Sequence, residues 1–251
     1  MLAFAATWAC WIPLAASGVL IRPGGWPTHM PGLIGPALAA FIVAAVSPSG
    51  PSVRDLLRRM VDWRIGSHAA IATLALPILF GVAALSAGAI GKPTPRWEAL
   101  GRLNGFPDAG PIVLWLLTVF VNGWGEEVGW RGFAIERLRE RRGLLGASLL
   151  LSPIWALWHV PAFFFLEGYR RFDAIMGAGY LFGLACGSIV LAWVYERSGK
   201  SLFAAALFHG TYNLFSASEA ARGFPAQVVT TGIMAAAVGI AISELRHRAG
   251  A

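Results

Sequence analysis

Two adjacent glutamates and one arginine interrupt an apolar run in the stretch Asn122-Gly-Trp-Gly-Glu-Glu-Val-Gly-Trp-Arg-Gly-Phe133. The run begins at Pro111, and the pattern predicts a helix over about 111–135, long enough to span a bilayer. A carboxylate in the centre of a bilayer costs about 2.5–3.5 kcal/mol on insertion scales. Because helix packing alone does not require such a cluster, the stretch indicates a membrane span that carries a functional site.

Helical spacing assigns different surroundings to the three charges. Glu127 and Arg131 are four residues apart, so they lie on one face and are predicted to form an ion pair. Glu126 points about 100° away and is predicted to be left free for other work. The alternative interpretation is a purely structural glutamate–arginine clamp between helices.

Composition places the chain in a membrane. Of its 251 residues, 57% are hydrophobic and only 13% are charged, whereas a soluble domain carries about 25% charge. The net charge of +7 comes from basic residues in short connections between apolar runs. This distribution is typical of the positive-inside rule and not of a surface that binds nucleic acid.

The apolar pattern predicts an all-α, polytopic membrane helix bundle, with residues 1–251 as a single transmembrane domain and the core motifs within 111–217. About eight spans are expected, at 2–21, 32–46, 68–91, 111–135, 144–166, 173–195, 201–217 and 224–244. The segment 47–66 has an amphipathic pattern and is interpreted as an interfacial connecting helix anchored by Trp63, without a role in substrate binding.

Loop charges and glycine spacing add two expectations. If the spans alternate in direction, the connections on one side hold twelve Lys and Arg residues and those on the other hold seven. This bias predicts a multi-pass protein of the cell (inner) membrane with both termini in the cytoplasm.

Gly179, Gly183 and Gly187 recur every four residues, which predicts close packing of the helix over 173–195 against a neighbour.

Three other strongly polar residues lie deep in predicted spans: His159, His209 and Asn213. At about 1.5 Å per residue, their depths and that of Glu126 fall at roughly 12–22 Å, so all four are compatible with one layer. A single intramembrane histidine is more often a hydrogen-bonded packing residue. Together with Glu126, however, these residues favour a site.

Hydrolysis is the chemistry that fits these residues. Glu126 would act as general base on a water, and His159 would hold or relay the proton. His209 and Asn213, four residues apart, would donate hydrogen bonds to an oxyanion, while Glu127 and Arg131 would brace the site.

Other protease chemistries lack their sequence signatures here. The chain contains no H-E-x-x-H, no Gly-x-Ser-x-Gly and no pair of deep aspartates. Glu126, His159 and His209 are also candidate ligands for a divalent metal such as zinc, so a metal-dependent and a metal-free site both stay open.

Three motifs in this order resemble those of the CPBP family, which comprises type II CAAX prenyl endopeptidases and bacterial Abi relatives. They are Glu126-Glu127-x-x-x-Arg131, an aromatic residue four positions before His159, and His209-x-x-x-Asn213. The resemblance implies an eight-helix intramembrane peptidase in which Glu126 and His159 activate water and His209 and Asn213 form the oxyanion site. The second motif usually begins with phenylalanine; Trp155 stands there instead and is expected to pack beside the site.

The predicted function is therefore that of a bacterial intramembrane endopeptidase. Its expected partners are the lipid bilayer and a membrane-associated peptide or protein substrate, a C-terminally prenylated one among the candidates, with no nucleic acid. The alternative is a non-hydrolytic scaffold, immunity factor or transporter that uses the polar cluster structurally. A transporter is less favoured because the sequence shows no inverted repeats.

Overall fold

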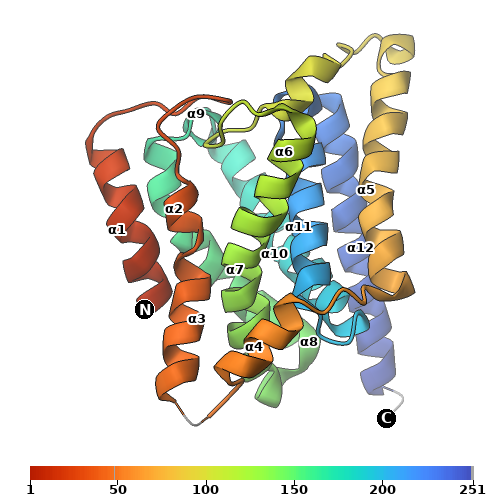
Figure 1. Ribbon diagram of the computed structural model, residues 1–251. Helices are drawn as coiled ribbons and strands as arrows, with labels where there is room; N and C mark the ends of the chain where they lie inside the picture. Colours follow the sequence, from red (N-terminus) through yellow and green to blue (C-terminus); the bar gives the residue numbers. More distant parts are fainter. Residues whose placement is uncertain (48, 250–251) are drawn as a thin grey trace.

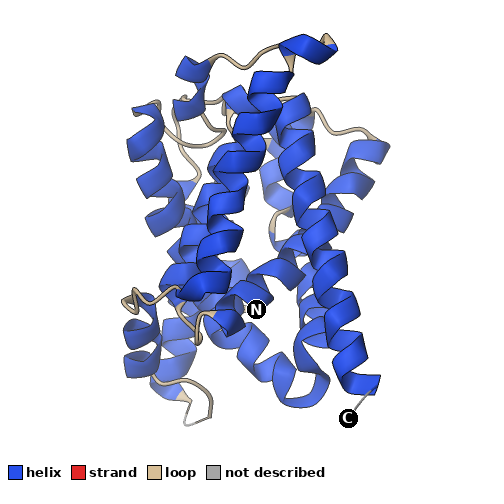
Figure 2. Cartoon of the chain, turned by 90° about the vertical axis from the view of Figure 1, so that its right-hand side faces the viewer, coloured by secondary structure: helices blue, strands red, loops and turns tan. Residues whose placement is uncertain are grey.

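Long helices run side by side through the molecule and are joined by short connections (Figures 1 and 2). The computed structural model describes residues 1–47 and 49–249. Within these residues there is no β-strand, and only isolated β-bridges occur, such as the one between Ile21 and Leu166. The predicted all-α membrane helix bundle is therefore confirmed.

Each predicted span has a helical counterpart. These are α1 (Leu2–Ala16), α2 (Met30–Leu33) with α3 (Gly35–Val46), α5 (Gly66–Ser86), a run that begins with α6 (Gly110–Leu117), the later part of α8 (Glu136–Trp158), α10 (Ala174–Arg197), α11 (Leu202–Ala217) and α12 (Phe224–Ala249). In the described part of the chain, three helices are long and apolar enough to cross a membrane, namely Gly66–Ser86, Ala174–Arg197 and Phe224–His247. The number of crossings stays a prediction.

Several helices end earlier than the apolar pattern predicts. The first ends at Ala16 instead of near residue 21, and Gly18 follows with a left-handed φ of 69°. The span predicted over 144–166 ends at Trp158, because Pro161 lacks the N–H that a continuing helix needs.

Shorter helices connect the long ones: α4 (Val53–Met60), η1 (Gly88–Ile90), η2 (Trp97–Gly101), η5 (Val160–Phe164), α9 (Glu167–Arg170) and η6 (Glu219–Ala221). At the other end of the chain, α12 continues to Ala249 through most of the predicted basic tail, whose last two residues lie outside the described chain.

The helix that carries the glutamates is not a regular α-helix. Two π-helical segments, η3 (Thr118–Gly123) and η4 (Trp130–Ile135), flank the short α-helix α7 (Trp124–Gly129). Such π-helical turns occur frequently at functional sites. The helix then continues into α8 until Gly143, where φ is 63° and the chain turns. Nothing in the residue pattern predicts the two π segments.

Glycines let the glutamate-bearing helix approach its neighbours. A Cβ atom on Gly125 or Gly129 would lie 2.5–2.6 Å from backbone atoms of α2 and α3. A Cβ on Gly123 would lie 2.7 Å from the carbonyl oxygen of Ala206, and one on Gly210 would lie 2.6 Å from the backbone of η3. Since real Cβ atoms do not approach so closely, α7 sits where it does only because these positions are glycine.

The predicted close packing through Gly179, Gly183 and Gly187 is wrong. A Cβ on Gly179 or Gly187 would meet nothing within 4 Å, and one on Gly183 would only touch the Met234 methyl at 3.6 Å. The four-residue spacing fixes a helix face, but it does not determine whether a neighbour covers that face.

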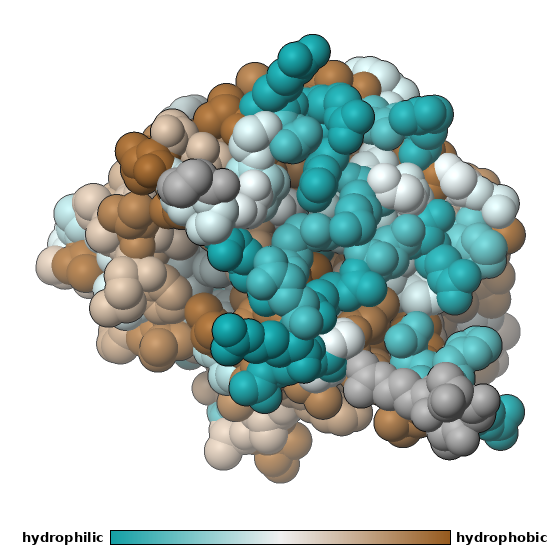
Figure 3. Space-filling model, turned by 90° about the horizontal axis from the view of Figure 1, so that it is seen from below, coloured by the Kyte–Doolittle hydropathy of each residue, from teal (hydrophilic) through white to brown (hydrophobic). Residues whose placement is uncertain are grey.

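The connections gather at two ends of the bundle in the predicted alternation. At the end that contains α4 and the end of α12, four contacts join three connecting segments: Arg137 to Ser49, Lys200 to Glu136, Arg139 to Glu196 and Ser201 to Asp62 (Figure 1). At the other end, contacts join Ile21 to Phe165, Gly24 to Leu103 and Glu219 to Arg102. Seen from the α4 end, hydrophilic side chains form a broad band with hydrophobic margins (Figure 3).

Candidate active site

Of the two adjacent glutamates, Glu126 is the one whose carboxylate accepts hydrogen bonds only from neutral groups. Its Oε1 accepts a hydrogen bond from Asn122 Nδ2 at 2.5 Å, and its Oε2 accepts one from Trp155 Nε1 at 2.6 Å. The side chain is buried, with 2% exposure. The prediction that Glu126 is left free is thus wrong, because Asn122 lies one turn earlier on the same face and Trp155 reaches it from α8. It remains correct that Arg131 pairs with the other glutamate.

Glu127 holds two partners through one oxygen. Its Oε1 lies 3.1 Å from Arg131 Nη1 and 2.6 Å from His209 Nδ1. The predicted ion pair with Arg131 is confirmed, and both of its side chains are fully buried. The bond to His209 was not predicted, because it depends on how α11 is rotated against α7.

Asn213 joins the cluster through Asn122. The Nδ2 group of Asn213 donates to Asn122 Oδ1, and Asn122 in turn donates to Glu126. Of the predicted residues on α11, His209 therefore contacts Glu127 directly, and Asn213 reaches Glu126 only through Asn122. Sequence reasoning did not select Asn122, although its position four residues before Glu126 is a usable signal.

Trp155 connects the remaining parts of the site. Its ring lies 4.6 Å from the Arg131 guanidinium carbon, and its backbone carbonyl oxygen lies 2.8 Å from His159 Nδ1. The His209 ring meets it edge-on, with centroids 5.8 Å apart. The expectation that Trp155 packs beside the site is confirmed, but its indole N–H also bonds Glu126, a contact that phenylalanine cannot make.

His159 lies at the end of α8 among aromatic rings. Its ring is edge-on to Trp158 at 4.7 Å between centroids, and to Tyr180 and Tyr169 at 6.1 and 6.5 Å. These two tyrosines come from α10 and α9 and were not predicted, since aromatic residues in apolar segments carry no distinguishing pattern. His159 as a whole residue is half-buried.

The hydrogen bonds fix the proton positions on both histidines. A backbone carbonyl only accepts, so His159 Nδ1 carries the proton and its Nε2 is left as an acceptor. The Glu127 oxygen that accepts from Arg131 also lies 2.6 Å from His209 Nδ1, so we assign the Nδ1 proton to His209 as the donor. His209 Nε2 can then donate to another group only when the imidazole is protonated.

The donor set does not suit a metal ion. In the described residues, no group of three or more histidine, cysteine, aspartate or glutamate side chains is arranged to hold one. Glu126 already accepts a hydrogen bond at each oxygen, and in the described residues the free Nε2 atoms of the two histidines are not grouped with a third such ligand. We therefore derive no step through a metal.

A helical membrane bundle that buries carboxylates beside two histidines and two asparagine amides has the groups that an intramembrane hydrolase needs. The family model described as type II CAAX prenyl endopeptidase Rce1-like matches residues 108–215, which include every predicted site residue. The chain is also 26% identical over 191 residues to CAAX prenyl protease 2 of Methanococcus maripaludis, covering 74% of this chain and 69% of the relative. Both matches support a CAAX-type intramembrane protease, the class that the CPBP-like motifs predict.

Proposed function

We propose that this protease cleaves a peptide bond near the C-terminus of a membrane-associated substrate, with Glu126 and His159 activating the attacking water. The observation that carries the proposal is the different surroundings of the two glutamates. Arg131 and His209 occupy Glu127, whereas Glu126 contacts only the neutral donors Asn122 and Trp155. A carboxylate without a cation partner keeps its basicity and can accept a proton from water.

His159 is proposed to assist Glu126 in activating the water; it is held by the backbone carbonyl of Trp155, whose indole N–H holds Glu126. The His159 Nε2 is an acceptor, so it can orient the same water or receive its proton. The water oxygen attacks the scissile carbonyl carbon, the carbonyl oxygen becomes an oxyanion, and the proton passes to the leaving amine as the C–N bond breaks. Glu126 returns to its ionised form.

His209 and Asn213 are the proposed oxyanion donors. The Asn213 amide has two N–H bonds, and Asn122 occupies one of them, which leaves one for the substrate. His209 donates through Nε2 in its protonated form, and the Glu127 carboxylate at Nδ1 stabilises that charge. Glu127 and Arg131 therefore act as positioning residues for His209 and Trp155.

A C-terminally prenylated peptide is the substrate we propose first, because the matching family and the relative are named for CAAX prenyl substrates. We further propose that residues 1–251 form one peptidase domain of the cell membrane with both termini in the cytoplasm. The more basic end of the bundle, which carries α4, supports this orientation.

Peptide cleavage by the purified protein tests the proposal. Full-length protein in detergent would be incubated with matched prenylated and unprenylated C-terminal peptides, and products identified by mass spectrometry. We expect cleavage of the prenylated peptide and its loss in His159→Ala. Cleavage of both peptides at equal rates would contradict the proposed substrate, and no cleavage by folded protein would favour the scaffold interpretation.

A further inference from the structure

A basic cavity lies at the α4 end of the bundle, away from the buried glutamates. The segment from α4 to Arg64 and the turn between α10 and α11 enclose a space of about 390 Å³. Its lining contains one carboxylate and four cationic side chains: Asp62, Arg58, Arg59, Arg64 and Lys200.

The carboxylate in the lining is already neutralised. Asp62 accepts hydrogen bonds from Arg64 at both oxygens, from Nε at 2.9 Å and from Nη2 at 3.0 Å. These bonds lower the pKa of Asp62 and raise that of Arg64. The pair therefore contributes no net charge to the cavity at neutral pH.

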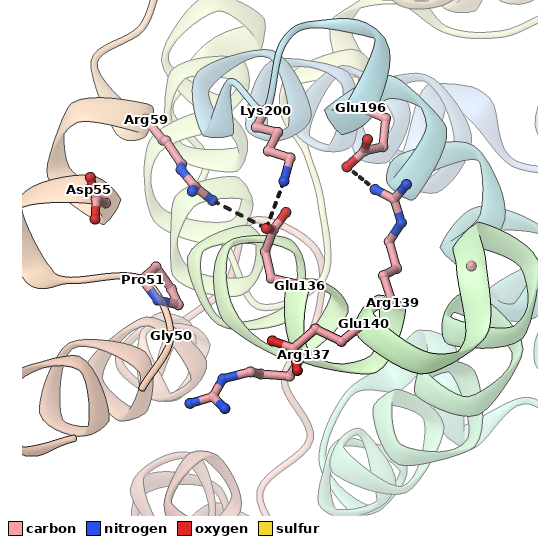
Figure 4. Close-up of a pocket in the computed structure, with 11 residues that line it drawn as sticks. Gly50, Pro51, Asp55, Arg59, Glu136, Arg137, Arg139, Glu140, Glu196 and Lys200 are labelled. Carbon is pink, nitrogen blue, oxygen red and sulfur yellow. Dashed lines mark hydrogen bonds and ion pairs between the residues drawn. The ribbon is translucent and has the colours of Figure 1, made fainter. Parts of the chain in front are cut away.

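The other three cations outnumber their partners. Lys200 Nζ lies 2.8 Å from Glu136 Oε2, and Arg59 approaches the same oxygen at 4.0 Å while bonding the Tyr195 hydroxyl at 2.7 Å. Figure 4 shows both side chains converging on Glu136. Arg58 makes no hydrogen bond or ion pair with any residue that the structure describes. Two carboxylates face these three cations, namely Glu136 and Asp55, whose charge acts on Arg58 and Arg59, so the cavity keeps a net positive charge.

An apolar surface adjoins these charges. Leu57, Val61 and Trp63, in or just after α4, are each more than half exposed, at 51%, 58% and 61%. The Trp63 ring packs on Phe203 at 4.1 Å between centroids, so it is held in place at the surface. This segment leads directly into α5, one of the helices able to cross a membrane, so the cavity lies at the membrane–water boundary.

We propose that this cavity binds the phosphate of an anionic phospholipid, with the acyl chains alongside Leu57, Val61 and Trp63. Arginine is well suited to phosphate because its planar fork donates parallel hydrogen bonds. Basic clusters next to membrane-spanning helices attract anionic headgroups, and each Lys or Arg near the surface contributes about 1 kcal/mol. The exposed apolar residues favour a lipid over free phosphate as the source of the anion.

Native mass spectrometry of the detergent-purified full chain tests the proposal. The protein would be titrated with dioleoyl phosphatidylglycerol, with dioleoyl phosphatidylcholine and with inorganic phosphate. We expect retention of phosphatidylglycerol and little retention of phosphatidylcholine. Arg58→Gln is expected to weaken phosphatidylglycerol binding about five-fold, and Arg58→Glu more than about ten-fold. Arg54→Gln is the matched control, because Arg54 carries the same charge on the same helix and does not line the cavity.

Three results would overturn the proposal: equal retention of both lipids, an equal loss in Arg54→Gln, or inorganic phosphate displacing the lipid at similar concentrations. The first two would indicate diffuse attraction to the basic end, and the third a free-phosphate site. Thermal unfolding of each variant checks that it is folded. The readout is lipid binding, so it does not depend on peptidase activity.

Discussion

Trp155 bonds Glu126 and His159 at the same time, through its indole N–H at 2.6 Å and its backbone carbonyl at 2.8 Å. The two residues proposed to activate water are therefore positioned by a single tryptophan, and its ring also covers Arg131. A shift of Trp155 would disturb the proposed base, the proposed relay and the buried ion pair together.

Trp155→Phe is the sharpest test of this link. The substitution keeps an aromatic ring but removes the donor to Glu126, and a hydrogen bond to a charged group is worth about 1.5–3 kcal/mol. We expect kcat/KM to fall by about ten-fold while the protein stays folded and active. Trp155→Ala, which also removes the ring beside Arg131, should lose more. Unchanged kinetics in Trp155→Phe would show that the indole N–H has no part in the reaction.

The Glu127–Arg131 pair should matter for stability. Both side chains are fully buried, and removing one partner of a buried pair typically costs about 3–5 kcal/mol, because it leaves an uncompensated charge. We expect Arg131→Met to lower the unfolding temperature strongly, and the double variant Glu127→Gln/Arg131→Met to recover part of the loss. Additive effects in this double-mutant cycle would contradict the pairing.

His29 should make stability depend on pH. It is buried in the connection before α2, packed on Trp11 and Phe106, and burial lowers its pKa from 6.5 to about 4. Between these values the unfolded chain binds a proton that the folded chain does not, so stability falls as pH decreases from 6.5 towards 4. The loss is on the order of 3 kcal/mol.

Unfolding temperatures measured across this pH range would check the effect. The control variant is His29→Gln, which does not titrate and should show a flatter pH dependence whatever its absolute stability. The same slope in both proteins would assign the pH dependence to other groups.

Chelator treatment tests the fit of the site to a metal. The described residues offer no group of three ligands, and Glu126 already accepts two hydrogen bonds. We expect cleavage rates to be unchanged after dialysis against a chelator. Activity that disappears on dialysis and returns with zinc would contradict a metal-free site.

Local spacing predicted one of the two side-chain contacts within the glutamate-bearing helix, and it missed the equally spaced bond from Asn122 to Glu126. The pairing of Glu127 with Arg131 follows from four-residue spacing, and the apolar runs located the spans with most of their boundaries. Contacts between helices could not be predicted in this way. The bond from Glu127 to His209 and the bond from Trp155 to Glu126 depend on how α11 and α8 are rotated against α7.

The glycines illustrate the same difference. A four-residue spacing suggested packing at Gly179, Gly183 and Gly187, whereas the close approaches occur at Gly123, Gly125, Gly129 and Gly210. The glycines that pack closely accompany the site residues in sequence, two of them next to Glu126 or His209. Their importance comes from the neighbouring helix and not from their own pattern.

Cleavage by Glu126→Gln, compared with Glu127→Gln, tests the central claim most directly. Both substitutions keep the size of the side chain and remove one charge. We predict that Glu126→Gln loses activity by about 10³-fold, because a general base is lost, and that its unfolding temperature falls less than that of Glu127→Gln, because one neutral hydrogen bond is lost but no ion pair is broken. We predict that Glu127→Gln is destabilised, because Arg131 loses its partner. A folded Glu126→Gln that still cleaves, beside a folded Glu127→Gln that does not, would contradict the assignment.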